Sequence, residues 1–266
     1  MSGVPPEVVF FVQQIAVAFT DDLGNRRDIR GTGFWVRNNN VDYFVTNAHN
    51  IEPRIVLGSD TKFKLAGIKI NLRLKAYDTW LPGNYDSEVI INDCVKIHIS
   101  ADVAVLKNPR FLHVPLGMTY QCFDVRDIAD DKWINDHVNV MDTASFIGFP
   151  GAKGVPWYDE LWNLGIARTV NIASHPEIGF SNSKIKTSDA LLVSGLSFAG
   201  SSGSAVFSHE KAPRLTPVLG GGGYVSPKLI GIMSGHWGQQ TTDADVFPHS
   251  GLSYFTRSGA ILSLLV

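Results

Sequence analysis

The 266-residue chain is poor in cysteine and has no marked excess of charge of either sign. Its two cysteines, Cys94 and Cys122, allow at most one disulfide, so a reducing compartment is the simpler interpretation. The formal net charge is -2, and the basic residues form no block. Such a surface does not favour a polyanion, so neither nucleic acid nor an anionic membrane is expected as a partner.

Long hydrophobic runs are also missing. The apolar segment at residues 8–12 is interrupted by Gln13 and Gln14 and follows no basic residue, so it is neither a convincing signal peptide nor a membrane span. We therefore expect a cytoplasmic protein, and a bacterial or viral origin fits this expectation. The histidines and carboxylates lack the spacing of zinc ligands, so no metal and no other cofactor is expected.

The chain does contain a series of short β-rich runs bounded by turn residues, a pattern typical of closed or packed antiparallel sheets. Helical periodicity is weak except at residues 256–265, where a terminal helix is expected. The predicted fold class is therefore all-β with a short C-terminal helix. The expected strands are residues 14–20, 34–37, 43–46, 69–75, 102–106, 145–149, 191–194, 205–208 and 229–233.

Residues 109–132 have few strand signals and carry an acidic tract, so they are the best candidate for a linker between two lobes. We place the boundary near residue 117, which gives an N-terminal domain over residues 1–117 and a C-terminal domain over residues 118–266. The glycine run at 220–223 lacks the following Lys and Ser or Thr of a phosphate loop. It is interpreted as a surface loop.

Three motifs place a histidine, an aspartate and a serine in that order along the chain. His49 ends the sequence Thr-Asn-Ala-His after a predicted hairpin, Asp102 enters an apolar run, and Ser202 lies within Gly-Ser-Ser-Gly-Ser. A serine hydroxyl attacks well when an adjacent imidazole takes its proton, and a carboxylate fixes the imidazole tautomer. Taken singly, the motifs also fit a turn, an ordinary histidine and a strand-end carboxylate, whereas together they indicate a catalytic triad. Ser204 is the competing nucleophile.

In these motifs the chain resembles the chymotrypsin-like (trypsin-fold) serine peptidases, and more closely the bacterial branch that includes the glutamyl endopeptidases. The resemblance implies two antiparallel six-stranded β-barrels, with His49 and Asp102 from the first and Ser202 from the second. The backbone N–H groups of Gly200 and Ser202 would form the oxyanion hole. The matching residues are Gly-Thr-Gly-Phe at 31–34, Thr-x-Ala-His at 46–49, Ala-Asp-Val-Ala-Val-Leu at 101–106, Gly-Phe-Pro at 148–150, Gly-x-Ser-Gly-Ser at 200–204 and Gly-Ile-Met-Ser-Gly at 231–235.

The chain departs from the animal-type pattern at several positions. Asn50 follows His49, and no cysteine flanks Ser202, so the usual disulfides beside these residues are missing. Ser201 stands before the nucleophile, where animal zymogens have an aspartate that pairs with a newly cut N-terminus. We therefore predict that the chain is competent without such a cleavage.

The resemblance also implies where a substrate binds. Leu196 and Ser197 would lie at the base of the primary specificity pocket, and the substrate backbone would run along Ser234, Gly235 and His236. Because position 196 is not acidic, a preference for Lys or Arg is not expected. His236 and Ser197 could bind a carboxylate of the residue before the scissile bond, but Met233 occupies the strand position where glutamyl enzymes usually have a histidine. We therefore expect a small or apolar residue there.

The predicted function is a serine endopeptidase that acts on a protein or peptide substrate through an acyl-enzyme. A protein partner supplied in trans stays open. Two alternative functions also stay open: a catalytically silent pseudo-peptidase that binds peptides or regulates another protein, and an esterase that uses the same triad. Turnover of small esters without peptide cleavage would distinguish the esterase.

Overall fold

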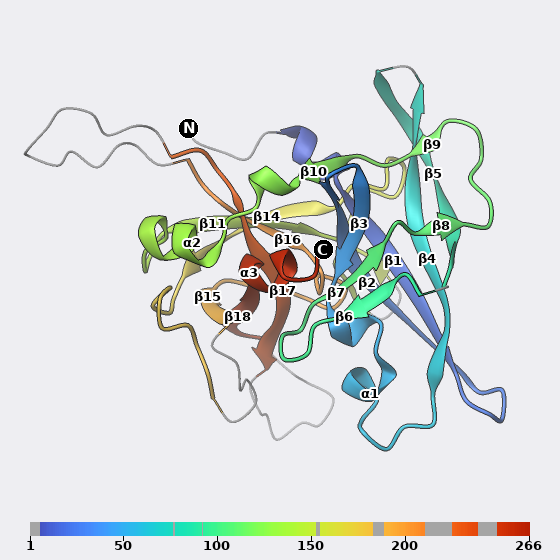
Figure 1. Cartoon of the computed structure of the whole chain (residues 1–266), viewed down its shortest axis with the longest axis horizontal. Helices are drawn as coiled ribbons and strands as arrows, with labels where there is room; N and C mark the ends of the chain where they lie inside the picture. The colour runs from blue at the N-terminus through green and yellow to red at the C-terminus, as the bar shows by residue number, and fades with distance from the viewer. Residues whose placement is uncertain are drawn as a thin grey trace, which may run out of the picture.

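A computed structural model of the chain describes residues 6–76, 78–91, 93–152, 155–182, 189–210, 225–238 and 249–266. Two mostly β lobes lie side by side, the first around β1–β10 and the second around β11–β18 (Figure 1). The described helical segments are short: η1 Pro6–Phe10, η2 Ala48–Asn50, α1 Pro53–Val56, η3 Val125–Asp127, α2 Asp131–His137 and α3 Ser258–Leu262.

The first lobe is a curled ten-stranded sheet with the order β6-β7-β3-β2-β1-β4-β5-β8, in which β9 also pairs with β4 and β10 runs parallel to β2. Its strands are β1 Val12–Thr20, β2 Arg26–Asn38, β3 Val41–Thr46, β4 Lys64–Ala76, β5 Thr79–Ile90, β6 Val95–Ile97, β7 Ala104–Lys107, β8 Arg110–Phe111, β9 Met118–Thr119 and β10 Cys122–Asp124.

The second lobe is a closed six-stranded barrel with the order β11-β14-β15-β18-β17-β16. Its strands are β11 Thr143–Gly148, β14 Ile166–Ile172, β15 Ala190–Ser194, β16 Ala205–Ser208, β17 Leu229–Gly238 and β18 His249–Arg257. A small hairpin of β12 Gly151–Ala152 and β13 Val155–Pro156 follows β11.

Local sequence explains the hairpin that leads to the histidine motif. Strands β2 and β3 are joined at Asn39 and Asn40, which have φ values of 48° and 64°. Asparagine tolerates this left-handed backbone, and two such residues match the right-handed twist of a tight hairpin. The strand β3 then ends at Thr46, directly before the segment that carries His49.

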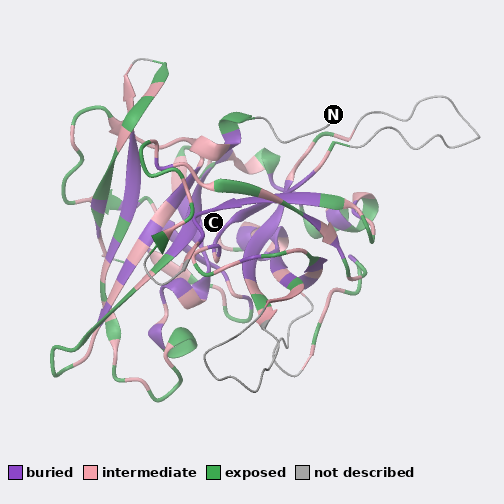
Figure 2. Ribbon diagram, turned by 180° about the vertical axis from the view of Figure 1, so that it is seen from behind, coloured by how far each residue is buried: buried purple, intermediate pink, exposed green. Residues whose placement is uncertain are grey.

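An apolar core continues across the two lobes. One cluster of buried residues includes Phe34 and Phe123 of the first lobe together with Ile147 and Phe207 of the second. Separate clusters fill the first sheet and the second barrel. Figure 2 shows the buried residues gathered at the centre of the molecule and the exposed residues on outer hairpins. This shared packing fixes the geometry of residues placed between the lobes.

The expected fold is confirmed as mostly β, and a strand lies at each of the nine predicted places. The expectation of two six-stranded barrels is met only by the second lobe, because the first sheet has ten strands and runs from β6 to β8 without a closing pair in the described chain. Asp102 lies just before β7 rather than in a strand, and the terminal helix is limited to α3.

Segments near the predicted linker add to the first sheet, since β9 and β10 lie beyond residue 117 and pair with β4 and β2. The glycine run at 220–223 lies outside the described residues. Cys94 and Cys122 are not joined by a disulfide. None of the helices in the described part of the chain is long and apolar enough to cross a bilayer.

Candidate active site

The structure brings His49 and Asp102 into direct contact. The Nδ1 atom of His49 lies 2.7 Å from Oδ2 of Asp102, and the backbone N–H of His49 donates to Oδ1 at 3.0 Å. Both side chains are about one quarter exposed, at 23% and 27%. A carboxylate that accepts from Nδ1 places the imidazole proton there and leaves Nε2 with a lone pair.

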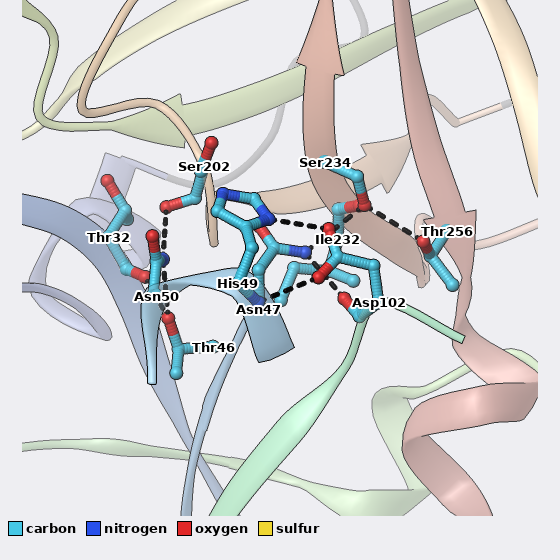
Figure 3. Close-up of polar contacts among 10 residues, drawn as sticks. All are labelled: Thr32, Thr46, Asn47, His49, Asn50, Asp102, Ser202, Ile232, Ser234 and Thr256. Carbon is cyan, nitrogen blue, oxygen red and sulfur yellow. Dashed lines mark hydrogen bonds and ion pairs between the residues drawn. The ribbon is translucent and has the colours of Figure 1, made fainter. Parts of the chain in front are cut away.

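Asp102 is itself held between the lobes by an amide. The Asn47 side chain donates to the backbone oxygen of Asp102 at 2.7 Å and to Ser234 Oγ at 3.1 Å. Ser234 Oγ also lies 2.8 Å from Thr256 Oγ1. These contacts connect the aspartate to β17 and β18 of the second barrel, so its position depends on both lobes (Figure 3).

The nucleophile motif forms a tight turn that requires glycine at two positions. Gly200 and Gly203 have φ values of +85° and +95°, a conformation that L side chains rarely adopt. A Cβ at Gly200 would come within 2.2 Å of Phe149 O, and one at Gly203 within 1.7 Å of Thr32 O. The turn therefore presses against backbone on both sides.

In two peptide groups of this turn the carbonyl oxygen is hydrogen-bonded within the protein, which fixes the opposite direction for the N–H of the same peptide. In a trans peptide the C=O and N–H groups point in opposite directions, and the described chain has no cis peptide. Ala199 O accepts the Gly151 N–H of β12 at 3.0 Å, so the Gly200 N–H, which belongs to the same peptide group, points away from β12. Ser201 O accepts from the Ser204 backbone and hydroxyl, so the Ser202 N–H likewise points away from these donors. Neither N–H has an acceptor among the described residues, so both are available to a bound oxygen.

Ser202 is half-buried, and its side chain lies on the side of the imidazole away from Asp102 (Figure 3). The competing residue, Ser204, is fully buried and donates its hydroxyl to Ser201 O at 2.6 Å. Of the two serines, Ser202 is the one whose hydroxyl makes no hydrogen bond within the described chain, either to His49 or to another residue.

The first lobe clamps the nucleophile turn through Thr32 and Asn50. Thr32 donates its backbone N–H to Ser202 O at 2.8 Å and its hydroxyl to Gly200 O at 2.6 Å. Asn50 donates to Thr46 Oγ1 at 3.0 Å and to Ser202 O at 3.2 Å. Histidine and serine therefore share one hydrogen-bonded frame, although they come from different lobes.

The residue before the nucleophile is held from inside the second barrel. Arg168 of β14 donates to Ser201 Oγ at 2.6 Å, and its guanidinium lies 4.5 Å from the centre of the Phe146 ring and 5.5 Å from that of Phe198. Burial lowers the pKa of Arg168 to about 10. This contact orders the turn without a charged chain terminus, and competence of the uncleaved chain stays a prediction.

The predicted specificity residues lie in different surroundings. Ser197 is buried and accepts from Ser253 Oγ at 3.0 Å, whereas Leu196 is 49% exposed. Ser234 is buried in the network below Asp102, so its hydroxyl faces protein rather than solvent. Gly235 packs against Tyr254, and His236 stacks on His249 with ring centres 4.7 Å apart.

His249 has a defined hydrogen-bonding role beside Ser197. Backbone N–H groups lie against both ring nitrogens, Gly251 N–H at 2.8 Å from Nδ1 and Ser197 N–H at 3.2 Å from Nε2, and Nε2 also lies 3.3 Å from Ser253 Oγ. Desolvation, followed by the charge of His236, lowers the pKa of His249. Desolvation also lowers the pKa of His236. Both rings therefore favour their neutral forms.

Sequence reasoning assigned no role to several residues around the site, although the first two lie within the matched motifs: Thr32, Asn47, Arg168, Tyr254 and His249. Asn50 could have been found from the sequence, because it follows His49 at a position where the family that the chain resembles usually has a disulfide. A Cβ at Gly31 would come within 2.6 Å of Asn50 Nδ2, so the glycine leaves the space that the amide fills. Arg168 gave no signal, since its partner lies 33 positions away in the chain. Tyr254 is also close to the site: burial, followed by the charge of Asp102, raises its pKa to about 12.

Within the described residues, no group of three or more His, Cys, Asp or Glu side chains is arranged to hold a metal ion. Comparison with models of protein families found no match, and none of the curated proteins compared with the chain matches it. The geometry of the site is therefore the basis on which a function can be inferred.

Proposed function

We propose that this chain is a serine endopeptidase. The observation that carries the proposal is the arrangement of His49 on Asp102 at 2.7 Å, with Ser202 beside the opposite edge of the imidazole. The N–H groups of Gly200 and of Ser202 itself have no acceptor in the described part of the chain. A hydrolase that uses an acyl-enzyme needs a base, an oriented nucleophile and donors for an oxyanion, and each has a candidate here.

In the proposed acylation, Ser202 Oγ attacks the scissile carbonyl carbon while its proton passes to His49 Nε2. The carbonyl oxygen becomes an oxyanion, which accepts from the N–H groups of Gly200 and Ser202. Asp102 stays ionised and stabilises the imidazolium. The intermediate then collapses, the C–N bond breaks, and the leaving amine takes the proton from Nε2.

Deacylation repeats these steps with water as the nucleophile. Water attacks the acyl carbon, gives a proton to His49 Nε2, and forms a second oxyanion in the same place. Cleavage of the ester bond returns that proton to Ser202 Oγ and releases the carboxylic acid. The cycle needs no cofactor, because every proton that leaves a group is taken by His49.

Labelling with a fluorophosphonate, followed by intact-mass measurement and mapping of the adduct, tests this proposal. We expect one adduct per chain at Ser202, and loss of labelling in Ser202→Ala and His49→Ala. Ser59→Ala is a matched control, because Ser59 is exposed and remote, and it should label like the native chain. A folded native chain that takes no adduct would contradict the proposal and favour a peptide-binding module.

A peptide library and a small ester separate the remaining alternatives. An endopeptidase cleaves internal bonds of library peptides, and both activities disappear together in Ser202→Ala. Ester turnover without any peptide cleavage would indicate an esterase. The same library tests the expectation of a small or apolar residue before the scissile bond.

A further inference from the structure

A pocket of about 460 Å³ opens beside Gly200. Gln14 of β1 and Arg30 of β2 line it from the first lobe. Its second-lobe wall is formed by Phe149, Pro150, Gly151, Val155, Pro156, Tyr158, Ala199 and Gly200. The pocket therefore spans the two lobes next to one of the N–H groups that would hold the oxyanion.

The lining places this pocket on the leaving-group side of the scissile bond. The acyl side of a substrate is expected along β17, and no residue of β17 belongs to the lining. Gly200 is the one lining residue that also belongs to the proposed catalytic site. A chain that continues past the oxyanion position, away from β17, therefore passes over the pocket.

Hydrogen bonds and ring contacts fix the walls. Gln14 Nε2 donates to the Tyr158 hydroxyl at 3.0 Å, and the Tyr158 ring packs edge-on against Phe149 with ring centres 5.1 Å apart. The Gly151 N–H donates to Ala199 O at 3.0 Å. Because the tyrosine oxygen accepts from Gln14, its own proton is free to donate to an occupant.

The described lining of the pocket carries charge of one sign. Among those residues Arg30 is the only cation and no carboxylate is present, and no described residue forms an ion pair with Arg30. The nearest acid along β2, Asp28, lies 2.9 Å from Arg26. Asp86 and Glu88 share another hollow with Arg30. Asp86 accepts from Asn71 Nδ2 at 2.7 Å, and Glu88 stands opposite Lys69 in the β4–β5 ladder. Arg30 is thus the cation left for a ligand.

We propose that this pocket selects a glutamate or aspartate at one of the first two residues after the scissile bond, an inference that rests on the proposed peptidase function. The carboxylate accepts from the Arg30 guanidinium and the Tyr158 hydroxyl, while the methylene groups pack on Phe149, Pro156 and Ala199. A charged donor prefers a carboxylate over its amide counterpart, whereas apolar walls alone would not distinguish them.

Cleavage of paired peptides tests the selection. Peptides that differ only by Glu or Gln at each of these two positions are compared for kcat/KM with the native chain, Arg30→Gln and Arg27→Gln. Arg27 is an exposed control on the same strand that does not line the pocket. We expect about a fivefold to tenfold preference for Glu at one position, lost in Arg30→Gln and kept in Arg27→Gln.

Two readouts keep this inference separate from the peptidase proposal. Fluorophosphonate labelling of Arg30→Gln should match the native rate, because the pocket does not touch the triad. Binding of Ala-Glu-Ala amide and Ala-Gln-Ala amide to Ser202→Ala, followed by NMR, tests the pocket without turnover. Equal cleavage and equal binding of the Glu and Gln peptides would overturn the inference, as would a Glu preference that survives Arg30→Gln.

Discussion

At the scale of single residues, the site depends on small polar side chains that cross from one lobe to the other. Thr32 illustrates this, because one hydroxyl donates to Gly200 O and accepts the Phe149 N–H at 3.0 Å. Neither bond follows from composition or periodicity, since both partners are backbone groups far away in the chain. The sequence therefore indicates the triad, whereas the frame around it becomes visible only in the structure.

Thr32→Val should weaken the site without changing its shape, because valine keeps the volume and loses the hydroxyl. Two buried groups lose a partner, so we expect a loss of about 2 kcal/mol in the free energy of unfolding. Release of Gly200 should slow fluorophosphonate labelling by at least about tenfold. Urea unfolding and labelling kinetics measure both effects. Thr32→Ser keeps the hydroxyl and should resemble the native chain, and native labelling by Thr32→Val would contradict this role.

The stability of the second barrel should depend on pH through His249. An unfolded histidine titrates near 6.5, whereas burial and His236 lower the pKa of His249 in the folded chain. Below pH 6.5 the unfolded chain therefore holds more protons than the folded chain, so the free energy of unfolding falls as the pH falls through this window. Protonation also removes the ring lone pair that accepts a backbone N–H. The free energy of unfolding, measured in urea from pH 5 to 8, should depend less steeply on pH in His249→Gln than in the native chain. The same pH dependence in both proteins would refute this.

At the scale of elements, strands were predictable because alternation and turn residues are local signals. The exact bounds were not, since β17 continues five residues past its predicted end and shifts register between Met233 and Gly235. The nucleophile turn was visible as a Gly-Ser run, but its need for glycine at both 200 and 203 comes from the opposing backbone. Packing against another lobe leaves no periodic trace in a sequence.

Gly203→Ala should disrupt the nucleophile turn. Its Cβ would lie 1.7 Å from Thr32 O at a φ of +95°, and neither backbone can yield without breaking the clamp. We expect a loss of at least about 3 kcal/mol in stability and no labelling of Ser202. Gly24→Ala is the matched control, since Gly24 has a φ of +82° and open space around it. It should lose about 1–2 kcal/mol and label normally. Equal losses of stability and labelling in the two variants would show that the positive φ, rather than the contact with Thr32 O, causes the effect.

At the scale of the whole molecule, the first lobe differed most from expectation, because closure of a sheet depends on pairing between distant strands. The lobes are joined by the shared apolar core and by Arg73 of β4, a fully buried side chain. Its guanidinium donates to Phe10 O, Val12 O and Asn163 O at 2.6–2.9 Å. The guanidinium also lies 5.9 Å from the centre of the Phe10 ring and 6.0 Å from that of Phe149, so it connects the N-terminal segment to the second lobe.

Arg73→Met should therefore destabilise the molecule as a unit. The variant leaves three buried carbonyls without a donor, and we expect a loss of about 3 kcal/mol or more in the free energy of unfolding. Because the lobes share a core, tryptophan fluorescence and far-UV circular dichroism should report one coincident transition in urea for the native chain. Arg54→Met is the control, since Arg54 is exposed and pairs with Glu52 at the surface, and it should cost less than about 1 kcal/mol. Two separated transitions in the native chain would mean that the lobes are stable independently, and that the hydrogen-bonded frame between them forms only after each has folded.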